Sequence, residues 1–559
     1  MIGEDLAIAQ SLPGDVAHPP HGDAGTGELH RTLDWKGAFW ASSGVPAGVL
    51  LTVGGIAATI GQPSWVVWIV SIMMGFVQSF VYAEIAGLYP HKSGGASVYG
   101  AAAWLPYSKF VAPVSVWANW LAWSPVLTLA TSLGAGYIMA VLFAPTAAIN
   151  HWQITLMDLG LVRPGLTLRI NAVSLIATAF LLLTFVMQHH GAARAAYIQK
   201  ILGAACLAPL ILVGLIPLIT GDLPSDRLFP LLPMVHAAGA VHFGTWNAYG
   251  LTLLMGAMFG AGWSTYGFET AVCYTREFGN PARDTPRAII ASGILCILIF
   301  SLVPLAFQAS LGLERMLAPD IYDGSGVAQA LASIVVKGIG AAATSRTGII
   351  VANVFIAMLI LSLLLIVMTS MMGSSRTLYQ ASVDGWLPKY LSRVNAHGAP
   401  TAAMWTDLGF NLILLLASDY FAVLMISNVC YLAFNFLNLQ AGWIHRIDRP
   451  ERERPFRCPT WLLALGCTFG FINMVFMGAG AEVWGAGTLR NGLIALLLIV
   501  PVFAFRHYVQ DKGVFPRSLV DDYALDGNGR MVRKAGVLPW VTLAACAAVI
   551  AGAHALARL

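Results

Sequence analysis

Charged residues are scarce in this sequence. Asp, Glu, Lys and Arg make up 10% of the 559 residues, whereas a soluble domain of ordinary composition carries about 25%. The 31 Lys and Arg nearly balance the 27 Asp and Glu, so the strong basic bias of a nucleic-acid-binding protein is also missing. This composition excludes a water-soluble enzyme and a nucleic-acid partner.

Motifs for metal or nucleotide binding are also missing. The seven cysteines form no C-x-x-C pair and have no metal-ligand spacing with histidine. The chain has neither a G-x-x-x-x-G-K-[ST] loop nor an H-E-x-x-H motif. A membrane enzyme acting on lipid would need His, Asp and Glu clustered in apolar runs, and no such cluster occurs. We therefore expect no enzymatic activity, no metal, no cofactor and no use of ATP.

Long apolar runs take the place of these features. Hydrophobic residues make up 57% of the chain, and the mean hydropathy is +0.72. About 20 mostly apolar residues cross a bilayer as a helix, and unbroken runs favour helices over a barrel. We predict an all-α polytopic membrane protein. Its predicted spans lie near residues 38–62, 64–90, 110–143, 170–189, 195–219, 249–275, 286–311, 347–372, 402–418, 421–444, 460–480 and 488–508, with a last one at 536–557.

The distribution of basic residues predicts the orientation. Basic residues are concentrated at 445–454 and 506–534, on the same side of the predicted membrane as the N-terminus, whereas the opposite loops are poorly charged. The positive-inside rule therefore places the N-terminus in the cytoplasm of a multi-pass cell-membrane protein. The first 35 residues have no apolar core of signal-peptide length, so we expect a cytosolic tail.

Two predicted spans contain clusters that interrupt a helix. The first span has ASSGVPAG at 41–48, and the sixth has GAGWSTYGFE at 260–269. Pro46 cannot donate a backbone hydrogen bond, and glycines loosen a helix. Each cluster alone is more typical of tight helix packing than of a binding site. Their corresponding places in the first and sixth spans favour a transporter built from inverted repeats with broken helices.

Five motifs carry a resemblance to a known family. They are SSGV at 42–45, the segment YAEIAGLYPHKSGG at 82–95, the fifth-span segment 198–210, the sixth-span segment with its NPARDTPR loop at 263–287, and the segment SRTLYQASVDGWLP at 375–388. With these motifs the chain resembles the amino acid–polyamine–organocation (APC) superfamily of permeases, in particular amino acid permeases of the amino acid/choline/GABA-like branch.

The resemblance implies a LeuT-type fold, a 5+5 inverted repeat in which helices one and six are broken. It covers roughly residues 35–445. We therefore expect a cytosolic tail at 1–36, a ten-helix transport core at 37–445, and two or three additional C-terminal transmembrane helices within 446–559.

The resemblance also implies a substrate site between the two broken helices. Helix one would meet a carboxylate through hydroxyl and backbone N–H groups, and helix six would meet an amine. Trp263 falls where related exchangers have an aromatic gate, with Tyr266 or Phe268 as alternative lids and an ordinary core aromatic as the other explanation. The expected substrate-binding residues are Ser42, Ser43, Gly44, Val45, Trp263, Ser264, Thr265, Tyr266 and Gly267.

Ionisable groups inside spans are costly and usually functional or paired. Glu269 is interpreted as a proton acceptor or a group that steadies the broken helix, and a structural role at a helix N-terminus is the alternative. Glu84 is expected to support the inner gate.

The coupling ion stays open between H⁺ and Na⁺. Many proton-coupled relatives carry a lysine in helix five, and the resemblance places Cys206 at that position, where a thiol substitutes poorly for an ammonium. Sodium held by helix-one carbonyls with hydroxyls such as those of Ser362 or Thr369 is one alternative. Substrate exchange without ion coupling is another.

These observations predict a secondary transporter of amino acids or related amines, working by alternating access as an ion-coupled symporter. The expected partners are a small zwitterionic substrate and the lipid bilayer, and the oligomeric state stays open. Few carboxylates other than Glu269 surround the predicted site, which favours neutral amino acids or GABA-like zwitterions. The alternatives are an exchanger or uniporter for polyamine- or choline-like organocations and a non-transporting nutrient sensor.

Overall fold

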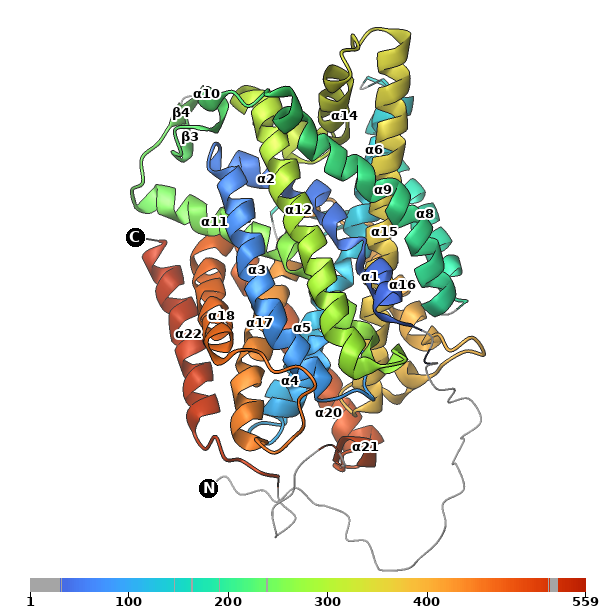
Figure 1. Cartoon of the computed structure of the whole chain (residues 1–559), viewed down its shortest axis with the longest axis vertical. Coiled ribbons are helices and arrows are strands. Elements are labelled where there is room, and N and C mark those ends of the chain that lie inside the picture. Colours follow the sequence, from blue (N-terminus) through green and yellow to red (C-terminus); the bar gives the residue numbers. More distant parts are fainter. Residues whose placement is uncertain are drawn as a thin grey trace, which may run out of the picture.

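The computed structural model shows helices that run mostly along one common axis (Figure 1). It describes residues 31, 33–144, 146–161, 164–190, 192–237, 240–520, 522 and 531–558. Most of the predicted N-terminal tail therefore lies outside the described residues. Ten helical stretches in the described part are long and apolar enough to cross a membrane, which confirms a mostly helical, multi-pass membrane protein.

The chain up to the second broken helix alternates long helices with short connecting elements. These elements are α1 (Trp35–Ser42), η1 (Val45–Gly48), α2 (Val49–Ile60), α3 (Ser64–Gly87), α4 (Ala96–Trp104), α5 (Val111–Trp123), α6 (Pro125–Leu142), α7 (Ala148–His151), β1 (Gln153–Asp158), β2 (Thr167–Asn171), α8 (Ala172–Gln188), α9 (Ala192–Thr220), α10 (Ser225–Leu228), β3 (Met234–Ala237), β4 (Ala240–Phe243), α11 (Ala248–Thr265) and η2 (Gly267–Glu277).

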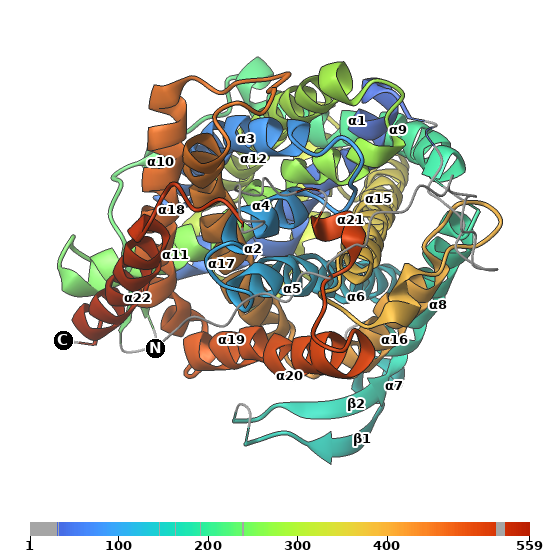
Figure 2. The same cartoon turned by 90° about the horizontal axis from the view of Figure 1, so that it is seen from below.

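The remainder of the chain contains the longest helices. These elements are α12 (Pro281–Met316), α13 (Pro319–Tyr322), α14 (Val327–Gly338), α15 (Arg346–Val383), η3 (Lys389–Ser392), α16 (Thr401–Leu414), α17 (Tyr420–Asp448), α18 (Thr460–Gly480), η4 (Ala481–Trp484), α19 (Thr488–Leu497), α20 (Ile499–Ala504), η5 (Phe505–Gln510), α21 (Arg517–Val520) and α22 (Leu538–Leu556). The strands form two antiparallel hairpins, β1–β2 and β3–β4, and the first of these projects beyond the helices at one edge (Figure 2).

Each predicted span contains a helix, although the lengths differ from those expected. The spans near 170–189, 249–275 and 402–418 contain the shorter helices α8, α11 and α16, which are not among the ten helices long and apolar enough to cross a membrane. The last run, at 536–557, forms the 19-residue helix α22, which is long and apolar enough to cross a membrane. It lies at the edge of the bundle beside α18 (Figures 1 and 2). A Cβ atom at Gly478 would lie 2.5 Å from the Ile550 carbonyl oxygen, a close approach typical of small residues between membrane helices.

Both predicted clusters change the type of helix. In the first span, α1 ends at Ser42 and the 3-10 helix η1 begins at Val45. In the sixth span, α11 ends at Thr265 and the 3-10 helix η2 begins at Gly267. The α-helical hydrogen-bond ladder therefore stops within each cluster, which leaves backbone groups available for other partners.

Oppositely charged side chains gather where the loop before α4, the end of α15 and the residues after α21 meet. The Lys92 ammonium lies 3.0 Å from an oxygen of Asp384 and 2.8 Å from an oxygen of Asp522. His91 Nε2 lies 2.7 Å from the other oxygen of Asp522. Burial alone would raise the pKa of Asp522, but the hydrogen bond from His91 and the charge of Lys92 hold that pKa below its usual range.

Replacing Asp522 with Asn is expected to lower the free energy of unfolding by roughly 1–3 kcal/mol at neutral pH, because Lys92 then keeps only one carboxylate. The folded-state pKa of Asp522 is depressed. Its contribution is therefore present above the unfolded-state pKa and is lost as the pH falls through the folded-state pKa. Thermal unfolding of purified wild type and D522N from about pH 3 to about pH 8 measures this.

The D522N variant should approach the wild type at the acid end of that range. D158N is the matched control, because Asp158 is exposed and, within the part of the chain that the structure describes, its carboxylate accepts only the nearby Gly160 N–H, at 2.8 Å. An equal difference between D522N and wild type at every pH would contradict the prediction.

Candidate functional site

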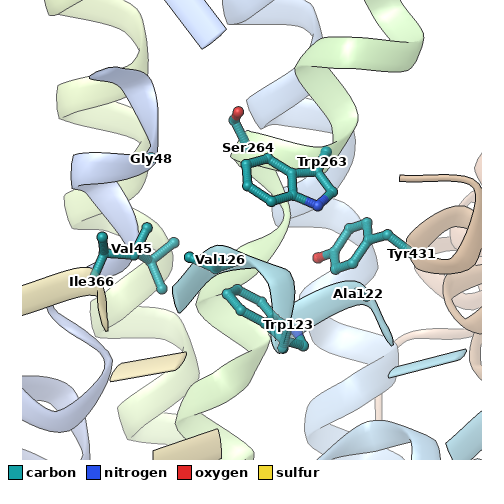
Figure 3. A pocket seen from close by; sticks show the side chains of 9 residues that line it. All are labelled: Val45, Gly48, Ala122, Trp123, Val126, Trp263, Ser264, Ile366 and Tyr431. Atoms are coloured by element: carbon teal, nitrogen blue, oxygen red, sulfur yellow. The ribbon is translucent and has the colours of Figure 1, made fainter. Parts of the chain in front are cut away.

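A small cavity lies where the two interrupted helices meet three other helical spans (Figure 3). Its lining residues are Val45, Gly48, Ala122, Trp123, Val126, Trp263, Ser264, Ile366 and Tyr431. The open space is about 10 Å³, about what one water molecule needs. A ligand of amino-acid size therefore requires these side chains to move apart.

Aromatic side chains form much of the cavity wall. In Figure 3, Trp263 lies above the cavity, Trp123 lies below it and Tyr431 lies to the right. The Trp263 indole N–H donates to the Ser427 hydroxyl at 3.1 Å, which fixes the ring. Trp123 and Tyr431 meet edge to face, with ring centroids 6.0 Å apart. The structure thus places Trp263 at the cavity, and its role as a gate stays a prediction.

Glu269 lies directly behind this aromatic wall and is only 3% exposed. Its carboxylate accepts hydrogen bonds from Trp123 Nε1 at 3.2 Å and from the Tyr431 hydroxyl at 3.1 Å. Among the described residues, no Lys, Arg or His forms an ion pair with it. A buried carboxylate with only neutral donors is costly unless a proton or a cation neutralises it. Glu269 also lies in the first turn of η2, which fits the structural alternative.

The serines of the first cluster are close to the cavity but their hydroxyls are used elsewhere. The Ser42 hydroxyl lies 2.7 Å from the Ser292 hydroxyl of α12, and the Ser43 hydroxyl donates to the Trp40 carbonyl at 2.7 Å. The Gly44 N–H donates to the Thr369 hydroxyl at 3.3 Å. Carboxylate binding by Ser42 or Ser43 therefore requires an exchange of these bonds and stays a prediction.

The second cluster is divided between the cavity and the packing behind it. Ser264 lines the cavity, and its hydroxyl lies 2.6 Å from that of Thr52. The Thr265 hydroxyl lies 2.7 Å from that of Ser71, behind the wall. A Cβ atom at Gly267 would lie 2.5 Å from the Trp123 ring. Gly267 therefore allows the broken helix to approach the cavity aromatics.

The predicted coupling residues fall into two separate places. The Thr369 hydroxyl donates to the Ala41 carbonyl of the first span at 2.8 Å. The Gln199 amide of α9 donates to this carbonyl and to the Thr369 hydroxyl, both at 3.2 Å. Cys206 instead lies against Ser362, whose hydroxyl points to the Cys206 carbonyl at 3.4 Å. Gln199 belongs to the fifth-span motif but was not predicted as a coupling residue, and its side chain reaches the broken helix.

Glu84 lies at the end of α3, away from the cavity. Its carboxylate accepts Arg446 Nη2 at 2.6 Å, Arg454 Nε at 3.2 Å and the Cys458 N–H at 2.8 Å. Two arginines compensate its charge, so it is a paired group, and its role at an inner gate stays a prediction.

Another buried ion pair, which was not predicted from the sequence, links Arg376 of α15 to Glu277 at the end of η2. Arg376 Nη2 donates to Glu277 Oε2 at 3.1 Å, and Arg376 Nε donates to the other carboxylate oxygen. This pair ties the broken sixth span to the long helix α15.

The half of the cavity that lies outside the broken helices was not predicted from the sequence. Ala122, Trp123 and Val126 come from the joint of α5 and α6, and Ile366 and Tyr431 come from α15 and α17. Apolar residues within apolar spans carry no local signal of a site. The nearest signal was Pro125, which begins α6 and interrupts the hydrogen-bond ladder beside Trp123.

Comparison with known proteins assigns the class that this fold and cavity suggest. The family model described as amino acid permease matches residues 33–503. The chain therefore belongs to the amino acid permease family of the APC superfamily, and it is a transporter rather than an enzyme.

Two similar proteins cover most of the chain. The branched-chain amino acid permease BcaP of Lactococcus lactis subsp. cremoris is 26% identical over 468 residues, which span 81% of this chain and 89% of BcaP. The polyamine transporter PUT1 of Oryza sativa subsp. japonica is 24% identical over 460 residues, which span 82% of this chain and 74% of PUT1. The lysine-specific permease LysP of the same Lactococcus is 26% identical over a shorter stretch of 167 residues.

Proposed function

We propose that this permease is a secondary transporter that carries neutral amino acids or GABA-like zwitterions across the cell membrane, coupled to protons. The observation that carries the proposal is the position of Glu269. Among the described residues, this buried carboxylate accepts side-chain hydrogen bonds only from the neutral donors Trp123 and Tyr431, and it lies directly behind the wall of an apolar cavity. Such a group is suited to bind a proton when the cavity closes and to release it when water enters.

The cavity lining supports a substrate with a neutral side chain. Val45, Val126 and Ile366 offer apolar contacts. Among the described lining residues there is no Asp, Glu, Lys or Arg, so a second charge on the substrate would have no partner there. A zwitterion could place its charged ends at the two helix interruptions, where backbone groups are released from the helical ladder.

The arrangement of the helices supports alternating access. In this proposal residues 37–445 form the 5+5 inverted repeat, residues 446–559 add the further helices, and the N-terminus lies in the cytoplasm. The interrupted spans α1–α2 and α11–η2 would move against the spans that carry Trp123, Ile366 and Tyr431. The cavity lies between these two groups, which is where alternating access requires a substrate site.

A polyamine-like organocation is the second candidate substrate, and one observation favours it. The Glu269 carboxylate has no cationic partner among the described residues, so a substrate amine could neutralise it in place of a proton. The similarity to PUT1 covers most of the chain and is compatible with this alternative.

Uptake into proteoliposomes tests the two candidates together. We expect saturable uptake of labelled neutral amino acids, with accumulation only when an inward proton gradient is imposed. A sodium gradient alone should give no accumulation. Saturable uptake of spermidine but not of neutral amino acids would overturn the proposal in favour of the second candidate, and binding without flux would indicate a sensor.

A further inference from the structure

A buried chain of amide and hydroxyl groups crosses from α3 to α11 through α17 and α18. The Asn435 amide donates to Gln78 Oε1 at 2.7 Å and to the Tyr82 hydroxyl at 2.5 Å. The Asn473 amide donates to Asn435 Oδ1 at 3.0 Å. The Tyr266 hydroxyl then donates to Asn473 Oδ1 at 3.1 Å. Asn473 of α18 therefore links Asn435 of α17 to Tyr266 at the break in the sixth span.

Tyr266 is the joint between α11 and η2. It follows the last residue of α11 and precedes Gly267, the first residue of η2. Its ring has little freedom, because a Cβ atom at Gly75 of α3 would lie 2.5 Å from it. Its ring centroid lies 6.3 Å from that of Tyr431, which lines the cavity and donates to Glu269. A movement of Tyr266 is thus transmitted to both the cavity wall and η2.

The hydroxyl of Tyr266 donates to Asn473 of α18, and the side chains of Ser71 and Gln78 of α3 also lie within its hydrogen-bonding reach. Asn473 is fully buried, at 0% exposure, and α18 packs against α3, α11 and α17 (Figure 1). A buried hydroxyl without a partner is strongly disfavoured, and water is scarce at this depth in a membrane. The Asn473 carboxamide therefore favours the one position of Tyr266 in which the hydrogen bond is made.

The geometry points to Asn473 as a positioning residue for the break in the sixth span. Asn473 lies in helix α18, which is outside residues 37–445. If Asn473 positions the break, α18 is a working part of the transport unit as well as a packing element. Asn473 is not among the residues that line the cavity, and it acts through Tyr266. The consequence for transport rests on the proposed function, whereas the effect on the joint at Tyr266 does not.

Hydrogen exchange tests the effect on the joint without knowledge of the substrate. The variants are N473L, Y266F and the double variant, each purified as the full chain. We expect N473L and Y266F to raise deuterium uptake to a similar extent in peptides that cover 262–277. We expect the double variant to raise it no further, because both changes remove the same hydrogen bond. T468V is the matched control on α18, since the exposed Thr468 hydroxyl bonds only to Ala464 of its own helix, at 3.0 Å.

Unchanged uptake in N473L, or additive effects in the double variant, would overturn the inference. In transport assays we expect N473L and Y266F each to raise the KM about fivefold to tenfold, again without addition in the double variant. A lower maximal rate at unchanged KM would indicate that Asn473 only supports folding, and would also overturn it. If the wild type carries none of the tested substrates, the proposed function fails, and the exchange experiment still decides this inference.

Discussion

In proteoliposomes, E269Q is expected to reduce proton-driven accumulation of substrate roughly tenfold or more, which is the usual size of a coupling between two ligands. Exchange of internal for external substrate should continue. Glutamine keeps the shape of Glu269 and an oxygen that accepts from Trp123 or Tyr431, but it cannot take up a proton. The measurement is uptake of a labelled neutral amino acid at several external pH values, with and without unlabelled substrate inside. Wild-type uptake should rise as the outside becomes more acidic, and uptake by E269Q should not depend on pH.

The control for this variant is E482Q. The Glu482 carboxylate lies in η4 and accepts the Gly487 N–H at 2.7 Å and the Leu489 N–H at 3.3 Å, remote from the cavity lining. The E482Q variant should therefore transport substrate as the wild type does. If E269Q loses exchange as well as accumulation, Glu269 has the structural role that its place in the first turn of η2 also allows. If E269Q accumulates substrate normally, the proton is bound elsewhere.

The second large effect is expected from the smallest substitution in the first span, Gly44 to Ala. A Cβ atom at Gly44 would lie 2.5 Å from the Leu365 carbonyl oxygen and 2.6 Å from the Thr369 hydroxyl. Since a backbone carbonyl of α15 cannot rotate away, the two spans must separate, at a cost of about 1–3 kcal/mol. This separation distorts the break in the first span. We therefore expect G44A to lose at least about nine-tenths of the uptake rate.

The matched control is G136A. Gly136 lies in α6, and a Cβ atom there would meet no atom within 4 Å, so alanine should leave transport unchanged and favour the helix by up to about 1 kcal/mol. Size-exclusion profiles of both variants distinguish loss of folding from loss of transport. Equal uptake by G44A and G136A would contradict the close approach of the first span to α15.

The positions of the apolar helices could be predicted from the sequence because the bilayer imposes a minimum length on every apolar run. Their number was predicted less well, since ten of the thirteen predicted spans contain a described helix that is long and apolar enough to cross a membrane. The interruptions could be predicted because Pro46 and the glycines of 260–267 act locally on the backbone. Both predictions depend only on near neighbours in the chain. The inverted repeat and the orientation of the N-terminus are statements about the whole membrane, and they stay predictions.

Only half of the cavity lining could be predicted, because only that half is marked by near neighbours in the chain. Val45, Trp263 and Ser264 lie beside a break and carry a local signal, and the structure places all three in the cavity wall. Ala122 and Ile366 occupy the facing wall as ordinary apolar residues, and only tertiary packing distinguishes them from lipid-facing neighbours. The contact of Gln199 with the first span could not be predicted, because its partner, the Ala41 carbonyl, is distant in the sequence.

The narrow centre of the molecule has a consequence for the membrane that holds it. Space for about one water molecule among Trp123, Trp263 and Tyr431 is too little for a continuous file of water from one face to the other. Ions need such a file to cross a hydrocarbon layer. With Trp123, Trp263 and Tyr431 closed together, we therefore expect no ion leak through this cavity, so that many copies of the permease in one membrane would leave its ion gradients intact.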